Sequence, residues 1–171
     1  TMLGDTGIAV NPNDKRYKHL IGKTVILPII KREIPIFSDE YVDLEFGTGC
    51  VKVTPAHDPN DFEMGLRNKL ETINIMHPNG QLNENCPENF QNLKREEARE
   101  KIIEVMQKKG LIEKIEKHTH QVGHSERTDA IVEPYISKQW FLKMEKLVDP
   151  ALEAVKNGEI KFYPEKWTKT Y

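Results

Sequence analysis

The stretch that decides the fold is residues 47–63, which reads GTGCVKVTPAHDPNDFE. Glycines open a turn at its start, and valines then alternate with polar residues at the two-residue period of a β-strand. Pro55 ends this strand, because proline has no N–H to donate to a neighbouring strand. Asp58 followed by Pro59 is typical of a helix start, with a side-chain cap and then proline at the first helical position. The stretch therefore predicts a turn, a strand and a helix in succession.

The corner between this strand and this helix gathers five polar side chains: Lys52, Thr54, His57, Asp58 and Asp61. Structural roles compete with functional ones at each position. An aspartate before proline commonly caps a helix, and an acid three residues later complements the helix dipole. Isolated loop histidines are commonly solvated or hydrogen-bonded. The density of polar groups at one corner nevertheless predicts a binding or catalytic site.

Residues 47–65 resemble the signature of the editing domain of the class I aminoacyl-tRNA synthetases for valine, isoleucine and leucine, in its valine variant above all. Further stretches similar to this family follow in order: 1–6, 17–25, 32–36, 120–127, 132–135 and 139–141. The resemblance implies a single editing domain over residues 1–171, with the pocket in about 1–117 and a segment returning toward a catalytic domain in about 118–171. Because the chain begins inside one of these motifs, we expect it to be part of a longer protein.

The fold implied by the resemblance is α+β, a closed β-barrel with helices packed around it. The residue pattern itself predicts six strands and three helices. The strands are expected at 7–10, 24–29, 34–37, 41–45, 50–54 and 72–76, and the helices at 59–68, 94–109 and 150–157. A β-sandwich would fit the same strand count equally well.

Composition and charge exclude several classes of protein. The chain is 37% hydrophobic and 30% charged, which is typical of a soluble globular domain, and no apolar run has the length of a membrane span. Two cysteines, Cys50 and Cys86, form no disulfide framework, so we expect a cytoplasmic protein. The net charge of −2 is not that of a protein that grips a nucleic acid backbone, so DNA is not expected as a partner. RNA would be bound only by its end.

No metal site is expected. His118, His120, His124 and Glu126 have no spacing typical of zinc ligands, and no cysteine accompanies them. The resemblance implies that editing needs no cofactor, because ATP and magnesium serve the catalytic domain of such synthetases, which lies outside this chain.

The resemblance implies a reaction, the hydrolysis of the ester in threonyl-tRNA(Val), after threonine has been transferred to the wrong tRNA. A hydrophobic pocket distinguishes threonine from valine only about 100-fold in the valine branch of this family, which is why a second, hydrolytic site is needed. Such a site must be polar, so that valine would leave its hydrogen-bonding groups unpaired. The expected partners are the 3′ end of tRNA(Val) carrying threonine and the remainder of the synthetase.

By resemblance, four residues are candidates for catalysis. Asp61 would hold the α-ammonium of the misattached threonine. Asp58 and Thr54 would contact the threonine side chain or position water, and Lys52 would place a positive charge near the ester.

Three further residues are implied at or beside the substrate. Thr1 would line the pocket, Phe46 would stack on a terminal base, and His57 would orient its neighbours. Since the threonine and arginine that precede Thr1 in the family motif are outside this chain, we expect the isolated domain to be a weak aminoacyl-tRNA deacylase.

Two other functions remain open from the sequence. One is a metal-dependent phosphohydrolase using His57, Asp58 and Asp61, although the preceding strand and Pro55 argue against it. The other is a non-catalytic insert that binds the acceptor end of tRNA.

Overall fold

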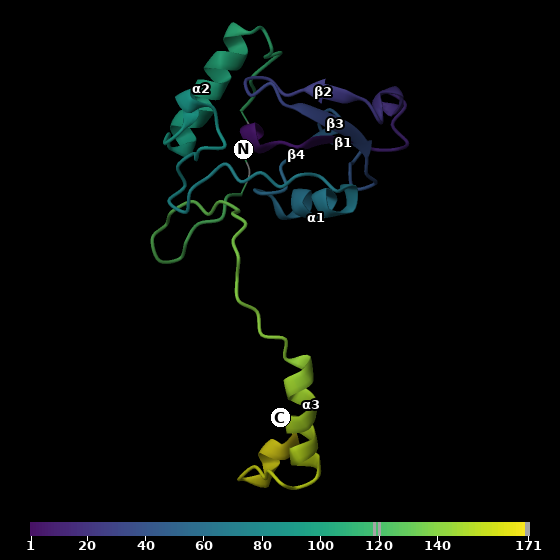
Figure 1. Cartoon of the computed structure of the whole chain (residues 1–171), viewed down its shortest axis with the longest axis vertical. Coiled ribbons are helices and arrows are strands. Elements are labelled where there is room, and N and C mark those ends of the chain that lie inside the picture. Colours follow the sequence, from purple (N-terminus) through teal and green to yellow (C-terminus); the bar gives the residue numbers. More distant parts are fainter. Residues whose placement is uncertain (118, 120, 170–171) are drawn as a thin grey trace. The chain divides into compact units, whose positions relative to one another are not determined.

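A computed structural model describes residues 1–117, 119 and 121–169 (Figure 1). The chain divides into two compact units, Thr1–Ile136 and Ser137–Tyr171. The sequence-based boundary near residue 117, between pocket and return segment, stays a prediction.

The first unit contains a four-stranded sheet made of β1 (Gly7–Val10), β2 (Thr24–Ile26), β3 (Glu33–Ser38) and β4 (Cys50–Val53). The strand order is β2-β3-β1-β4. β1 runs parallel to β3 and antiparallel to β4, while β2 is antiparallel to β3. The fold is therefore α+β, as predicted, and strands occur at four of the predicted places, although β2 ends at Ile26 and not at 29.

The expected closed barrel is wrong for the part of the chain that the structure describes, because the sheet stays open at β2 and β4. Two predicted strands are missing. In the segment 41–45, turns formed by acidic side chains use the backbone groups that a strand would need. Asp39 accepts a hydrogen bond from the Tyr41 N–H at 3.0 Å, and Asp43 accepts one from the Glu45 N–H at 2.8 Å.

The second missing strand is the segment 72–76, and side chains again replace the ladder. The Ile75 N–H donates to Nε2 of His57 at 3.0 Å. The Met76 N–H donates to Oδ1 of Asn74 at 2.9 Å. With these donors satisfied by side chains, the segment forms an isolated antiparallel bridge between Met76 and Leu82 in place of a strand.

The helix α1 (Pro59–Asn68) has the predicted bounds and lies along one face of the sheet (Figure 1). Its start is fixed by Asp58, whose side chain accepts hydrogen bonds from the N–H groups of Asn60 at 2.8 Å and Asp61 at 3.1 Å. Its Met64 side chain is fully buried against the sheet. The buried cluster at this face consists of Ala9, Val42, Val53 and Met64.

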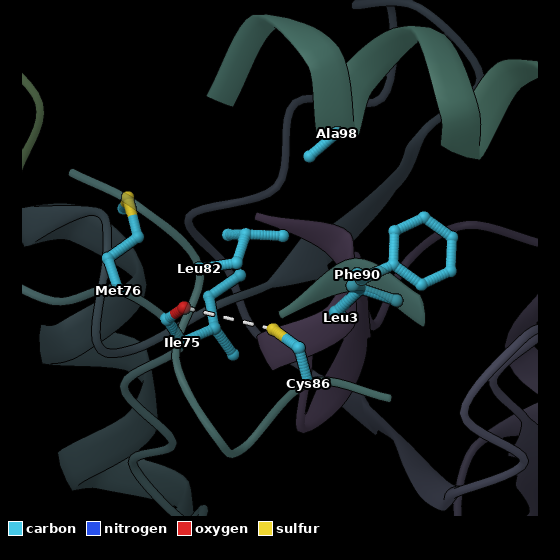
Figure 2. Close-up of a cluster of buried hydrophobic side chains, with 7 residues drawn as sticks. All are labelled: Leu3, Ile75, Met76, Leu82, Cys86, Phe90 and Ala98. Atoms are coloured by element: carbon cyan, nitrogen blue, oxygen red, sulfur yellow. Dashed lines mark hydrogen bonds between the residues drawn. The ribbon is translucent and has the colours of Figure 1, made fainter. Parts of the chain in front are cut away.

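A second core cluster lies under the helix α2 (Arg95–Lys108), whose Ala98 points into it (Figure 2). The cluster consists of Leu3, Ile75, Met76, Leu82, Cys86, Phe90 and Ala98. The Sγ of Cys86 donates to the carbonyl oxygen of Ile75 at 3.7 Å, and burial raises the pKa of this thiol to about 11. Cys86 is therefore a neutral packing residue.

The second unit contains the helix α3 (Glu145–Lys156), which begins before the predicted start at 150 and includes Pro150. None of its residues is buried. Short 3-10 helices complete the described structure, at Met2–Gly4, Lys18–Leu20, Glu88–Phe90 and Glu165–Lys169. Among the described residues, no helix combines the length and the apolar character that crossing a membrane requires. His118 and His120 lie outside the described residues.

Candidate functional site

The register between β1 and β4 brings the residues before β1 to the end of β4. Gly7 pairs with Val53, and the Thr6 N–H donates to the Val53 carbonyl at 2.9 Å. Lys52 and Thr54 lie two residues apart and therefore project to the same side. This arrangement places Asp5 beside Thr54.

Lys52 joins these groups into one polar network. Its Nζ donates to the hydroxyl of Thr54 at 2.8 Å and to the hydroxyl of Thr1 at 3.3 Å. It also lies 3.5 Å from Oδ1 of Asp5. Half of the Lys52 side chain remains exposed, so its ammonium can reach a bound molecule while it holds the two hydroxyls.

Asp5 is the member of the network that sequence reasoning missed. It is 2% exposed, and it accepts a hydrogen bond from the Thr54 hydroxyl in addition to its ion pair with Lys52. Burial raises the pKa of Asp5, and Lys52 and the Thr54 hydroxyl act in the opposite direction. Asp5 lies two residues before the predicted strand 7–10, but no local sequence signal indicates its distant partners Lys52 and Thr54.

Asp61 reaches the network through the backbone. Its Oδ2 accepts the N–H of Thr54 at 2.8 Å, and the side chain is buried. Burial raises the pKa of Asp61, the hydrogen bond from Thr54 lowers it, and the negative charge of Asp58 raises it. Within the described residues, Oδ1 of Asp61 has no hydrogen-bond partner, yet it is not fully enclosed. Asp61 therefore keeps one oxygen available.

His57 is held as a neutral imidazole with a defined tautomer. Its Nε2 accepts from the Ile75 N–H at 3.0 Å, so Nδ1 carries the proton and donates to the carbonyl of Pro134 at 3.2 Å. Burial lowers the pKa of His57, with an opposing contribution from the Pro134 carbonyl. With both nitrogens engaged, the ring has no lone pair left for a proton or a metal. It fixes the positions of its neighbours instead.

No group of three or more histidine, cysteine, aspartate or glutamate side chains in the described part of the chain is arranged to hold a metal ion. Asp58, the other acid at this corner, uses its carboxylate to cap α1.

A cavity of about 240 Å³ opens beside the network. Thr1 and Lys52 line it together with the apolar side chains of Leu3, Ile75 and Ala98, and we call the part next to Lys52 its polar end. One wall is a face of α2 that carries two arginines. The cavity thus combines a hydrogen-bonding end with an apolar body, which is typical of sites for small organic groups.

Comparison with known proteins shows the family. A family model described as "Leucyl-tRNA synthetase, editing domain" matches residues 11–120, well over half of the chain. The chain belongs to this family of aminoacyl-tRNA synthetase editing domains.

Curated valine–tRNA ligases match this editing domain over its whole length. The sequence identity is 57% over 171 residues with the ligase of Clostridium tetani and 57% over 172 residues with that of Bacillus subtilis. It is 54% over 171 residues with the ligase of Helicobacter pylori. In each case 100% of the chain is covered but only 19% of the ligase, so the editing domain spans about a fifth of the length of these relatives.

One solved structure, the ternary LeuRS–tRNA–LeuAMS complex of Agrobacterium radiobacter K84 agnB2, is similar over 64% of this chain and 16% of its own. The sequence identity is 22% and the TM-score 0.49. A similarity at this level says nothing about the substrate of the editing domain.

The structure does not bring all the predicted site residues of the editing domain to the cavity. Thr1 and Lys52 line it, Thr54 accepts a hydrogen bond from Lys52, and Asp61 accepts one from the Thr54 N–H. Asp58 caps α1, and His57 joins the distant residues Ile75 and Pro134. Phe46 is 77% exposed in the turn before β4 and is absent from the cavity wall. The roles of all seven residues toward a substrate stay predictions.

Proposed function

We propose that this editing domain hydrolyses the ester of threonine misattached to tRNA(Val), after transfer, as the proofreading module of a valine–tRNA ligase. The observation that carries the proposal is the convergence of Lys52 Nζ on the hydroxyls of Thr1 and Thr54 at the polar end of an apolar cavity. The valine–tRNA ligases that match the whole chain support the choice of amino acid.

The polarity of this end suits threonine better than valine. A threonine hydroxyl can share hydrogen bonds with Thr1 and Lys52. A valine methyl group at the same place would desolvate them and leave them unpaired, which costs about 1–3 kcal/mol for each buried group. Selection against valine would therefore follow from missing hydrogen bonds and would need no steric exclusion.

Asp61 is suited to hold the α-ammonium of the amino acid. Its Oδ2 is fixed by the Thr54 N–H, which leaves Oδ1 to accept a charge-assisted hydrogen bond in a defined orientation. Lys52 would then stabilise the negative charge that develops on the ester oxygen as water attacks. Thr54 is not free to act as a nucleophile, because its hydroxyl donates to Asp5 and accepts from Lys52.

The partners in this proposal are the single-stranded 3′ end of tRNA(Val) and the rest of the synthetase. A domain of net charge −2 has little electrostatic attraction for RNA. Tethering to a tRNA-binding body compensates, because it gives the second binding event a high effective concentration. The isolated domain should accordingly be the weaker deacylase.

A comparison of deacylation rates in the full-length ligase tests the proposal. Threonyl-tRNA(Val) should be hydrolysed faster than valyl-tRNA(Val) by the wild-type enzyme. Asp61→Asn keeps an acceptor for the Thr54 N–H but removes the negative charge, and should slow threonyl-tRNA hydrolysis roughly ten- to a hundredfold. Asp43→Asn is the matched control, because Asp43 is an exposed aspartate that also accepts one backbone N–H. Equal hydrolysis of the two tRNAs, or equal rates for both variants, would contradict the proposal.

The same experiment separates the competing functions. A non-catalytic insert would bind the tRNA end without hydrolysing it. A metal-dependent phosphohydrolase would need His57 as a ligand, and the hydrogen bonds at both of its nitrogens oppose that role. Loss of activity on treatment with a chelator, with the tRNA kept folded by restored magnesium, would favour the metal enzyme.

A further inference from the structure

The wall that α2 contributes to the cavity carries two arginines. Arg95 and Arg99 are four residues apart, so they lie one turn apart on the same face, about 5–6 Å from Cβ to Cβ. Both line the cavity together with Ala98 and Lys52. The helix α2 therefore places two guanidinium groups at the edge of the cavity, next to its apolar lining.

Three cationic side chains line this cavity, and two of them have an acidic partner. Arg95 lies 3.4 Å from Glu133 and 3.6 Å from Glu96. Lys52 lies 3.5 Å from the buried Asp5. Arg99 is exposed and forms no hydrogen bond or ion pair with any residue that the structure describes.

A solvated surface role is the ordinary explanation for an exposed arginine on a charged helix. Two observations set Arg99 apart. It lines the cavity, and among the cationic side chains there it is the one with no described acid within ion-pair distance. Glu96, one turn earlier on the same helix, is engaged by Arg95. A ligand that fills the cavity would therefore meet an uncompensated guanidinium.

We propose that Arg99 binds the phosphodiester that precedes the terminal nucleoside of the RNA whose end enters this cavity. The inference rests on the proposed function, because it takes an RNA end as the substrate. An anion at Arg99 would give this guanidinium a partner, and the planar guanidinium matches phosphate oxygens in a bidentate arrangement. The apolar lining would take the nucleoside, and the polar end would take the aminoacyl group.

One anchored phosphate fits the electrostatics of the whole chain. Arg99 adds a single contact at the mouth of the site, while the scattered charges elsewhere give no continuous basic track for a longer RNA. The anchor would fix how deeply the terminal nucleoside enters, and so where the ester meets Lys52.

Titrations of the 171-residue chain with three probes test this inference: adenosine, adenosine 5′-monophosphate and the RNA trinucleotide CCA. NMR chemical shifts report weak binding without any need for hydrolysis. We expect the wild-type chain to prefer the monophosphate to adenosine, and to bind the trinucleotide at least as tightly. Arg99→Gln should weaken binding of both phosphate-containing probes roughly three- to tenfold and leave adenosine unaffected. Lys109→Gln, which also removes one exposed cation near α2, is the matched control and should change nothing.

The inference is overturned if wild-type binding shows no preference for phosphate, or if Arg99→Gln and Lys109→Gln behave alike. It is also overturned if only the monophosphate depends on Arg99, because the site would then serve a free mononucleotide. Hydrolysis is measured separately. If the chain prefers phosphate-containing probes but the full-length ligase does not deacylate threonyl-tRNA(Val), the proposed function alone is rejected. If the ligase does deacylate it but Arg99→Gln leaves probe binding unchanged, this inference alone is rejected.

Discussion

Lys52, Asp5 and Thr54 illustrate at the residue scale how a charged group can be held beside a cavity. Asp5 is buried, so its negative charge is stable only because the Lys52 ammonium and the Thr54 hydroxyl face it. The same contacts fix Lys52, which would otherwise sample many rotamers at the surface. The position of the exposed Lys52 ammonium thus depends on the buried carboxylate of Asp5.

This dependence predicts a pH effect on stability. Burial raises the pKa of Asp5 above its ordinary value of 3.8, so the folded protein holds this proton more tightly than the unfolded chain. The stabilising contribution is complete below the unfolded pKa and is lost as the pH rises through the folded pKa. We therefore expect the free energy of unfolding of the wild-type chain to fall, relative to Asp5→Asn, as the pH rises from about 4.

Urea unfolding of both proteins over a series of pH values measures this difference. Asp61 is present in both proteins, but the charge of Asp5 contributes to its raised pKa, so the measured difference reports Asp5 together with its effect on Asp61. A wild-type advantage that grows as the pH rises would show that Lys52 outweighs the desolvation of Asp5.

At the element scale, Asp58 has two separable roles. It caps α1 through two backbone N–H groups, and the family resemblance gives it a place near the substrate. Asp58→Asn should preserve the cap, whereas Asp58→Ala should destabilise the domain by about 1 kcal/mol. If Asp58 also meets the substrate through its charge, both variants should slow deacylation, and Asp58→Asn should do so with an unchanged urea midpoint. If the Asp58→Asn variant is fully active, Asp58 acts only as the N-cap of α1.

The elements show which features a sequence can predict. The bounds of α1 were predicted because its signals are local: Asp58 and Pro59 start it within two positions. The segment 72–76 was predicted as a strand, yet its backbone bonds to the side chain of His57, and no local pattern encodes that contact. Asp5 was missed for the same reason, since its partners lie almost fifty residues later in the chain.

At the scale of the whole molecule, the two units differ in how their helices are stabilised. α1 buries Met64 and Gly65 in the first unit, whereas α3 buries none of its 12 residues. Apolar side chains on α3, among them Leu147 and Leu152, remain exposed. A helix of this length with no buried residue is marginal in water.

Hydrogen exchange in the 171-residue chain should therefore show faster exchange for the amides of α3 than for those of α1. The measurement is best made at several protein concentrations. Protection of α3 equal to that of α1 at every concentration would contradict the expectation, and protection that rises with concentration would reveal self-association through its apolar side chains.

The two hydrogen bonds of His57 also have a consequence for the order of folding. The ring joins residues 18 and 77 positions away in the chain, Ile75 and Pro134. Contacts of such long sequence separation form late, because the loops between them must close first. During synthesis, Lys52, Thr54 and Asp61 would leave the ribosome well before Pro134 does. The Nδ1–H of His57 could find its acceptor only when that carbonyl arrives, so the site would reach its finished geometry in one of the last steps of folding.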